Sequence, residues 1–310
     1  MITACICFRN EGDEVENTIK SILSTTSHTK IMLVDDCSDD STDYLAVANK
    51  YNCEYYRMNE RCGSVGTKDF AGRNCQTEYF VLLDGHMRFY EQGWDMKLIK
   101  LLDKYPRSII SSRTSYISRD TQGNLQGDKE CVMRSYCAYM RFGDGYDFDP
   151  RWTDKVANYN DADKTSDVSC VLGACYATTK SWWGGIDGLH GLNIYGLEES
   201  FMSIKTWLLG GSCKVTHDFA AGHLYRDVNP NRINSAEIDS NRLLLAYLFD
   251  CNTAELSAQL YKRLGLFLYG EALETFSNRL EEYKQIKDYL KSKQVRPFEF
   301  ILDLNKKLTQ

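Results

Sequence analysis

Residues 79–89 read YFVLLDGHMRF, and the first five form an unbroken apolar and aromatic run. A run this short, bounded by a turn, is typical of a strand buried on both faces of a parallel or mixed sheet. The run ends at Asp84, Gly85 and His86. Open α/β sheets bind their ligands at the carboxyl ends of such strands, so the sequence indicates a candidate site here.

The chemistry of this strand end allows two interpretations. Side chains at positions i and i+2 of an extended segment point the same way, so Asp84 and His86 could share one divalent cation. Gly85, which has no side chain, would let a bulky phosphate approach the backbone. An ordinary turn after a strand, where Asp and Gly are common, explains the same residues equally well.

Composition narrows the class of protein. The chain has 310 residues, of which 43% are hydrophobic and 26% charged, as expected for a globular protein of one large or two small domains. No apolar run approaches the length of a membrane span. Residues 2–8 are too short and wrongly flanked for a signal peptide, so we interpret them as the first core strand. The net charge of −6 argues against broad, nonspecific nucleic-acid binding.

The cysteines, twelve in all, contain no CxxC pair. This absence argues against a zinc or redox motif. Several cysteines lie in apolar, strand-like runs: Cys5, Cys7, Cys170 and Cys175. Because the sequence carries no export signal, we expect reduced thiols that fill the core of a cytoplasmic protein.

The first part of the chain alternates expected strands and helices. The strands cover residues 2–8, 31–34, 53–57 and 79–83, and residues 63–75 turn from glycines into a helix. The first two helices place these apolar residues on their inner faces at helical spacing: Val15, Ile19, Ile22 and Leu23, then Tyr44, Leu45 and Ala48. This order predicts a mostly parallel, doubly wound sheet with right-handed crossovers. The GxGxxG fingerprint of dinucleotide-binding folds is absent.

The rest of the chain is less regular. Residues 113–167 are rich in Tyr, Arg, Asp and Gly and hold one strand-like piece, at 131–142. A stretch of this kind is usually a functional or a disordered loop. The other elements expected here are helices at 94–103 and 198–209, strands at 108–112, 168–178 and 214–219, and helices from residue 238 onward.

Several short motifs follow one another in a recognisable order. They are Asn10-Glu11, Val34-Asp35-Asp36 with Ser38, GTKDFAGRN at 66–74, Asp84-Gly85-His86, YGLEE at 195–199 and GHLYR at 222–226. With these motifs the chain resembles the GT-A glycosyltransferases, broadly those of family 2. The resemblance is closer to the catalytic domain of polypeptide N-acetylgalactosaminyltransferases, and it spans roughly residues 2–250.

The resemblance implies an α/β fold and an enzymatic activity. The fold would be the Rossmann-like GT-A fold, a mostly parallel sheet flanked by helices with a C-terminal helical extension. Residues 1–237 would form the catalytic domain that binds nucleotide sugar and metal, and residues 238–310 the extension packed on it. The activity would be metal-dependent transfer of a hexosyl or N-acetylhexosaminyl group from a UDP-sugar, with retention of configuration.

The resemblance also implies roles for single residues. Asp84, His86 and His223 would bind Mn²⁺, with Mg²⁺ as an alternative, and the cation would stabilise charge on the departing diphosphate. Asp36 would accept a hydrogen bond from the uracil ring beside Cys7, although a helix-capping role explains Asp36 alone equally well. Other donor contacts would come from Lys68, Arg73, Gly85, Tyr195, Tyr225 and Arg226, the last two in a mobile lid.

Glu198 and Glu199 are the candidate catalytic residues. By resemblance Glu198 would bind a sugar hydroxyl in a retaining reaction. The nearest alternative is an inverting GT-A transferase of glycan synthesis, with Glu198 or Glu199 as general base. A purely structural alternative is that both positions are acidic because negative charge is favoured at a helix N-terminus. A further alternative is a non-catalytic protein that binds nucleotide sugars.

The chain also departs from the family at three positions of the donor segment. Tyr195 replaces a Trp, Leu197 a Gly and Glu199 an Asn. The donor sugar and the acceptor therefore stay open, the acceptor being a protein, a glycan or a modified nucleic-acid base.

Overall fold

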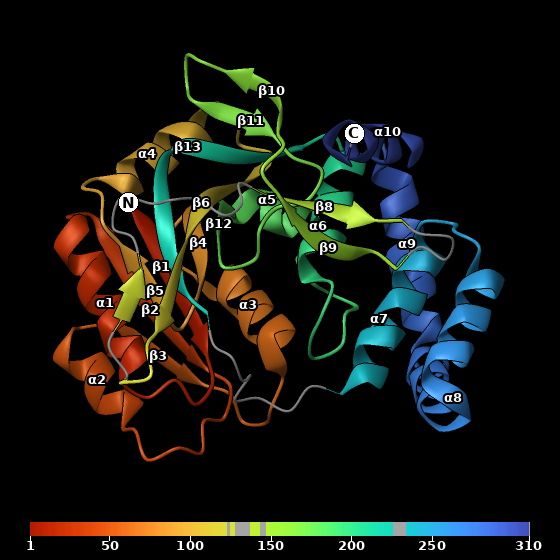
Figure 1. The fold of residues 1–310 in the computed structure, drawn as a ribbon, viewed down its shortest axis with the longest axis horizontal. Helices are drawn as coiled ribbons and strands as arrows, with labels where there is room; N and C mark the ends of the chain where they lie inside the picture. The colour runs from red at the N-terminus through yellow and green to blue at the C-terminus, as the bar shows by residue number, and fades with distance from the viewer. Residues whose placement is uncertain (123–124, 128–136, 143–146, 226–233, 310) are drawn as a thin grey trace.

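The computed structural model describes residues 1–122, 125–127, 137–142, 147–225 and 234–309. Its centre is an 11-stranded sheet with helices on both faces (Figure 1). The N-terminal part supplies β1 (Ile2–Phe8), α1 (Asp13–Thr25), β2 (Thr29–Asp35), α2 (Tyr44–Lys50), β3 (Glu54–Arg57), α3 (Gly63–Asn74) and β4 (Tyr79–Asp84).

The first four strands form the parallel part of the sheet, in the order β3-β2-β1-β4. Cys7 of β1 pairs with Asp84 of β4, and Phe8 pairs with Asp35 of β2. The carboxyl ends of these strands therefore meet at one edge. The predicted parallel α/β arrangement is confirmed for this half.

Two hydrophobic cores lie on opposite faces of the sheet, as the alternation along β1 requires. Ala4, Ile6 and Phe8 face α1, α2 and α4, whereas Cys5 and Cys7 join the core on the other side. The predicted inner positions Leu23 and Leu45 are wrong. Leu23 is 44% exposed and Leu45 52% exposed, because each turns away from the buried stripe of its helix.

The sheet becomes mixed beyond β4. After β5 (Met87–Phe89) and α4 (Trp94–Lys104), β6 (Ser108–Arg119) runs parallel to β13 (Ser212–Leu224). β12 (Cys175–Thr179) lies between β4 and β6 and is antiparallel to both. Both β6 and β13 are longer than predicted. The longer β13 includes His223 near its C-terminal end.

The expectation that 113–167 is mostly irregular is wrong where the structure describes it, although the strand-like piece expected at 131–142 is confirmed at Cys137–Arg141. Short strands occupy much of it: β7 (Leu125–Gly127), β8 (Cys137–Arg141), β9 (Asp149–Thr153), β10 (Ala157–Asn160) and β11 (Thr165–Asp167). β9 and β10 are partly exposed and contain polar residues, so they lack the apolar runs that predict buried strands.

The expected strand 168–178 is also only partly correct, because regular pairing starts at Cys175. The preceding residues are mostly buried, and side chains of α6 satisfy two of their backbone groups. Ser203 Oγ accepts from the Val171 N–H at 3.1 Å, and Trp207 Nε1 donates to the Val168 carbonyl at 3.1 Å.

The remaining helices complete the molecule. They are α5 (Lys180–Gly185), α6 (Glu198–Leu208), α7 (Ser235–Leu248), α8 (Thr253–Asn278), α9 (Leu280–Lys293) and α10 (Glu299–Thr309). Helices α7 to α10 lie together on the side away from α1 and α2 (Figure 1), which confirms the C-terminal helical extension. The division at residue 237 stays a prediction.

Two further findings concern the described part of the chain. The ten cysteines whose side chains the structure describes are free thiols, as predicted. None of the helices in the described ranges has the length and apolar character that crossing a membrane requires.

Candidate functional site

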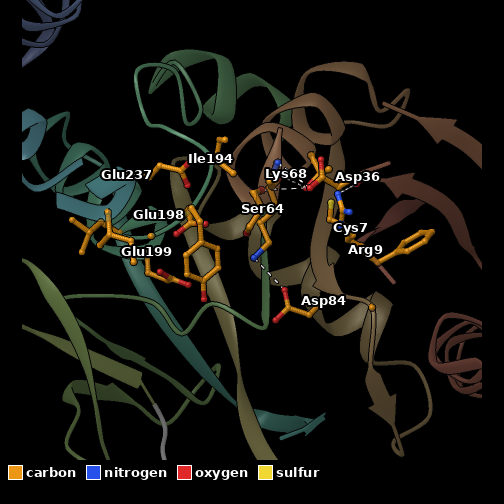
Figure 2. Close-up of a pocket in the computed structure, with 18 of the residues that line it drawn as sticks. Cys7, Arg9, Asp36, Ser64, Lys68, Asp84, Ile194, Glu198, Glu199 and Glu237 are labelled. Atoms are coloured by element: carbon orange, nitrogen blue, oxygen red, sulfur yellow. Dashed lines mark hydrogen bonds and ion pairs between the residues drawn. The ribbon is translucent and has the colours of Figure 1, made fainter. Parts of the chain in front are cut away.

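A cavity of about 580 Å³ opens at the carboxyl edge of the parallel strands (Figure 2). Its walls come from the ends of β1, β2, β4 and β13 and from the starts of α3, α6 and α7. Most of the predicted site residues line it: Cys7, Asp36, Lys68, Asp84, Gly85, His86, Tyr195, Glu198, Glu199, His223 and Tyr225.

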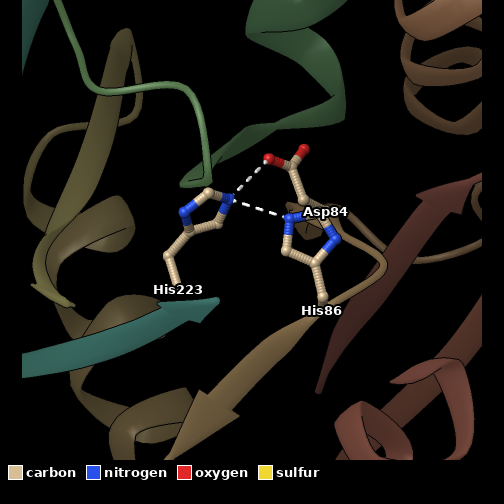
Figure 3. A group of neighbouring side chains, drawn as sticks. All are labelled: Asp84, His86 and His223. Atoms are coloured by element: carbon tan, nitrogen blue, oxygen red, sulfur yellow. Dashed lines mark hydrogen bonds and ion pairs between the residues drawn. The ribbon is translucent and has the colours of Figure 1, made fainter. Parts of the chain in front are cut away.

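Three of these side chains converge into a candidate metal centre (Figure 3). Asp84, His86 and His223 each offer one ligand atom, and these atoms lie within 4.8 Å of one another. His223 Nε2 is 3.1 Å from His86 Nε2 and 3.5 Å from Asp84 Oδ2. The pairing of β13 with β5, which sets His223 opposite Met87, brings the distant histidine here.

The protonation of the three groups suits a cation. Burial lowers the pKa of His223 despite the nearby Asp84, so this imidazole is neutral at neutral pH. Burial would raise the pKa of Asp84, but Lys68 and His223 outweigh it and hold that pKa well below its usual range. One carboxylate and two imidazoles form a donor set that binds Mn²⁺ and similar divalent metals.

Lys68 lies beneath this centre. Its buried Nζ is 3.2 Å from Asp84 Oδ1, as the dashed line in Figure 2 marks. Burial favours the neutral amine, but Asp84 and other nearby acidic groups, Glu198 among them, raise the pKa of Lys68 above its usual value. The lysine therefore stays charged and holds one carboxylate oxygen, while Oδ2 faces His223.

Asp36 serves the fold in this structure. Its carboxylate accepts the N–H of Cys62 at 2.7 Å and of Gly63 at 3.0 Å, which caps the start of α3. Gly63 has a φ of +67°, and a Cβ there would lie 2.1 Å from the Ile194 carbonyl oxygen. Cys7 lies beside Asp84 in the sheet, and burial raises the pKa of its thiol to about 12.

Glu198 and Glu199 open α6 and line the cavity, where Glu198 is buried and Glu199 is half-buried. The preceding Leu197 has a φ of 69°, the left-handed conformation, at a position where the resembled family has glycine. Burial, and then the charge of Glu198, raise the pKa of Glu199 to about 7. Near neutral pH this carboxyl group can therefore both donate and accept a proton.

An aromatic wall joins the candidate metal centre to the surface. Tyr225 stacks on Tyr116, with ring centroids 4.9 Å apart, and its ring is 4.4 Å from that of His223. Trp152, which is 52% exposed, meets Tyr225 edge-on at 5.0 Å. This wall offers a stacking surface beside the cavity.

Two predicted residues are not part of the described site. Arg73 does not line the cavity, because it pairs with Asp69 at 2.7 Å and with Asp187 at 2.9 Å. Arg226 lies outside the described residues.

Other lining residues were not predicted: Arg9, Glu11, Arg61, Asp149, Glu237 and Arg242. Among these, Glu11 carried a signal, because it belongs to the Asn10-Glu11 motif. Asp149 and Arg242 form an ion pair across the cavity wall, from β9 and α7. No local pattern marks such a long-range pair.

Comparison with known proteins shows which families and structures this chain resembles. Residues 3–148 match the family model described as glycosyl transferase family 2. A structure of GalNAc-T7 with UDP, GalNAc and Mn²⁺ superposes with a TM-score of 0.73 at 17% identity, over 98% of this chain and 56% of that one. The chain has the GT-A glycosyltransferase fold.

Among curated proteins, this GT-A chain is similar to polypeptide N-acetylgalactosaminyltransferases. It is 23% identical to enzyme 16 of Mus musculus, over 91% of this chain and 50% of that protein. It is 24% identical to enzyme 14 of Homo sapiens, over 73% of this chain and 41% of that protein. The GT-A chain thus spans half or less of the length of these relatives.

Proposed function

We propose that the protein is a metal-dependent glycosyltransferase that moves a sugar from a UDP-sugar to an acceptor hydroxyl. The observation that carries the proposal is the convergence of Asp84, His86 and His223 beside a cavity at the carboxyl edge of the sheet. The names of the relatives support sugar transfer, and the complex of GalNAc-T7 with UDP, GalNAc and Mn²⁺ supports the donor and the metal.

In this proposal the three converging residues would hold Mn²⁺, or Mg²⁺ in its place. When bound, the metal supplies Lewis-acid stabilisation of the charge that develops on the leaving diphosphate. Lys68 keeps the Asp84 carboxylate aligned and adds positive charge below it. The UDP-sugar would lie in the cavity against Cys7, Asp36, Gly85, Tyr195 and Tyr225.

We propose retention of configuration, with Glu198 binding a sugar hydroxyl. A second candidate is an inverting reaction with Glu199 as general base, which is supported by the raised pKa of its carboxyl group. The anomeric configuration of the product, measured by NMR, decides between them. A product bond with the donor's configuration excludes the direct base mechanism.

For the acceptor we propose a polypeptide hydroxyl, because the curated relatives are named polypeptide transferases. The aromatic wall at Trp152 and Tyr225 supports an acceptor or sugar that stacks on flat rings. A panel of peptides and glycans, each offered with the same donor, tests this choice. Transfer to glycans alone would contradict it.

Calorimetric titration of UDP into the purified chain tests the core of the proposal. We expect binding in the presence of Mn²⁺ that is lost when a chelator is added. Absence of UDP binding under both conditions would contradict the proposed function. Metal-dependent UDP binding without donor hydrolysis or transfer would identify a non-catalytic nucleotide-sugar-binding protein instead.

A further inference from the structure

A carboxylate outside the ligand set contacts His86 on the far side of its ring. Glu11 Oε2 is 3.0 Å from His86 Nδ1, and the Glu11 side chain is only 7% exposed. The opposite nitrogen, Nε2, faces His223. Because an ionised carboxylate accepts but cannot donate, the proton of a neutral His86 belongs on Nδ1. The lone pair then belongs on Nε2, toward the candidate metal centre.

The position of Glu11 is fixed by its own neighbours. The N–H groups of Glu11 and Gly12 both donate to the Tyr44 hydroxyl, at 2.9 and 2.8 Å. That hydroxyl donates in turn to Asp40 at 2.6 Å. The turn between β1 and α1 is thereby anchored to the start of α2, so Glu11 reaches His86 from a rigid support.

Gly85 provides the space that this contact needs. A Cβ at position 85 would lie 2.7 Å from Glu11 Cγ and 2.9 Å from Phe8 Cβ. Both distances are shorter than real carbon contacts allow, and Phe8 is a buried core residue that cannot yield. A side chain at position 85 would therefore displace Glu11 from its place beside His86, whether or not a phosphate approaches the glycine.

We propose that Glu11 is a positioning residue of the metal site, which holds His86 in the tautomer that presents Nε2 to His223 and Asp84. The inference rests on the proposed function of these three residues as metal ligands. A carboxylate partner fixes the orientation and tautomer of a ligating histidine, and its loss typically costs about 10- to 100-fold in metal affinity.

The first test needs no metal. In protein labelled with ¹⁵N-histidine, NMR reports which ring nitrogen of His86 carries the proton. We expect the Nδ1–H tautomer in the wild type and a shift toward the other tautomer in Glu11→Ala. Glu11→Gln, whose amide oxygen still accepts a hydrogen bond, should keep the wild-type tautomer. A His86 protonated on Nε2 in the wild type, or an unchanged tautomer in Glu11→Ala, would overturn the proposal.

The second test measures Mn²⁺ affinity in the presence of UDP. We expect a loss of about 10- to 100-fold in Glu11→Ala and a smaller loss in Glu11→Gln. Gly85→Ala should weaken affinity through the same contact, so the double variant should lose less than the sum of the two. Glu16→Gln is the matched control, because Glu16 lies on α1 and pairs with Lys50.

Two outcomes of the second test count against different claims. Wild-type Mn²⁺ affinity in folded Glu11→Ala or Gly85→Ala would overturn the positioning role while leaving the proposed function intact. A wild-type protein that binds no Mn²⁺ would overturn the metal site itself. The tautomer measurement would then still decide whether Glu11 fixes His86.

Discussion

At the residue scale, two aspartates of one cavity have different surroundings: Asp84 lies in the candidate metal centre, and Asp36 supports the fold. Asp84 points one oxygen at the candidate metal centre and the other at Lys68. Asp36 uses both oxygens to cap α3. Asp84 is the last residue of β4 and Asp36 directly follows the last residue of β2, so their sequence contexts are similar. The two aspartates differ in the partners that folding brings to them. Asp84 meets the buried ammonium group of Lys68, whereas Asp36 meets two backbone N–H groups.

Replacing His223 by Ala should remove most of the metal-dependent UDP affinity. The imidazole would be one of three metal ligands, so we expect the affinity to fall by at least about 100-fold. This loss is larger than the one expected for a residue that only positions a ligand. Calorimetry with and without Mn²⁺ measures it. His217→Ala is the control, because His217 lies on the same strand and contacts Ser166 instead. Unchanged affinity in folded His223→Ala would remove this residue from the site.

Replacing Glu199 by Gln should stabilise the metal-free protein as the pH rises. The pKa of Glu199 is raised from 4.5 to about 7 in the folded protein, so protonation of this side chain favours the folded state. This stabilisation is fully present below the pKa of the unfolded chain and is lost as the pH rises through the pKa of the folded protein. The free-energy gain of the variant should reach up to about 3 kcal/mol above pH 7.

Melting temperatures of both proteins, measured from about pH 5 to pH 8, test this expectation. The melting temperature of the wild type should fall relative to that of Glu199→Gln as the pH rises across that range. Glu281→Gln, at an exposed position of α9, should follow the wild type at every pH. Parallel curves for the wild type and Glu199→Gln would show that Glu199 titrates normally in the folded protein.

At the scale of elements, the last helix supports a hairpin that reaches the cavity. Asn305 of α10 accepts from the Met140 N–H at 2.8 Å and donates to the Met140 carbonyl at 2.7 Å. It also accepts from the Ser169 hydroxyl at 2.8 Å. Met140 pairs with Pro150, which lines the cavity beside Asp149. The Asn305 side chain of α10 thus makes the hydrogen bonds to β8 that a neighbouring strand would otherwise make.

Asn305→Ala should therefore destabilise the protein by about 2–4 kcal/mol, because it leaves buried backbone groups of Met140 without partners. Denaturant unfolding measures the change. Lys307→Ala, at an exposed position of the same helix, should have little effect. A loss below about 0.5 kcal/mol for Asn305→Ala would mean that β8 does not depend on α10.

At the scale of the whole molecule, the C-terminal helices share a core with the sheet. Leu244 of α7, Tyr283 of α9 and Ile301 of α10 belong to the same buried cluster as Phe80 of β4 and Phe201 of α6. Such sharing couples the stability of the two parts, because separating them would expose apolar surface on both.

We therefore expect the chain to unfold in one cooperative transition, followed by circular dichroism and by tryptophan fluorescence during urea titration. A fragment of residues 1–237 should show no cooperative transition of its own. Two separated transitions in the full chain, or a fragment that unfolds cooperatively, would instead support two independently stable domains.

The sequence by itself determined the elements of the parallel half and the place of the candidate site. Strands β1 to β4 follow from apolar runs and helices α1 and α2 from helical spacing, which are local properties of the chain. Asp84 and His86 are close in sequence, so a strand end alone brings them together. The later motifs, including the one with His223, were found through resemblance and not through spacing.

Only the tertiary structure decided which distant groups meet. The pairing of β13 with β5 places His223 Nε2 3.1 Å from His86 Nε2. The anchored turn between β1 and α1 places the Glu11 carboxylate beside Nδ1 of the same His86 ring. Packing also holds Arg73 away from the cavity, where it pairs with Asp187 of a distant segment. These contacts form because long-range packing, not local propensity, compensates for the chain entropy lost when distant segments are brought together.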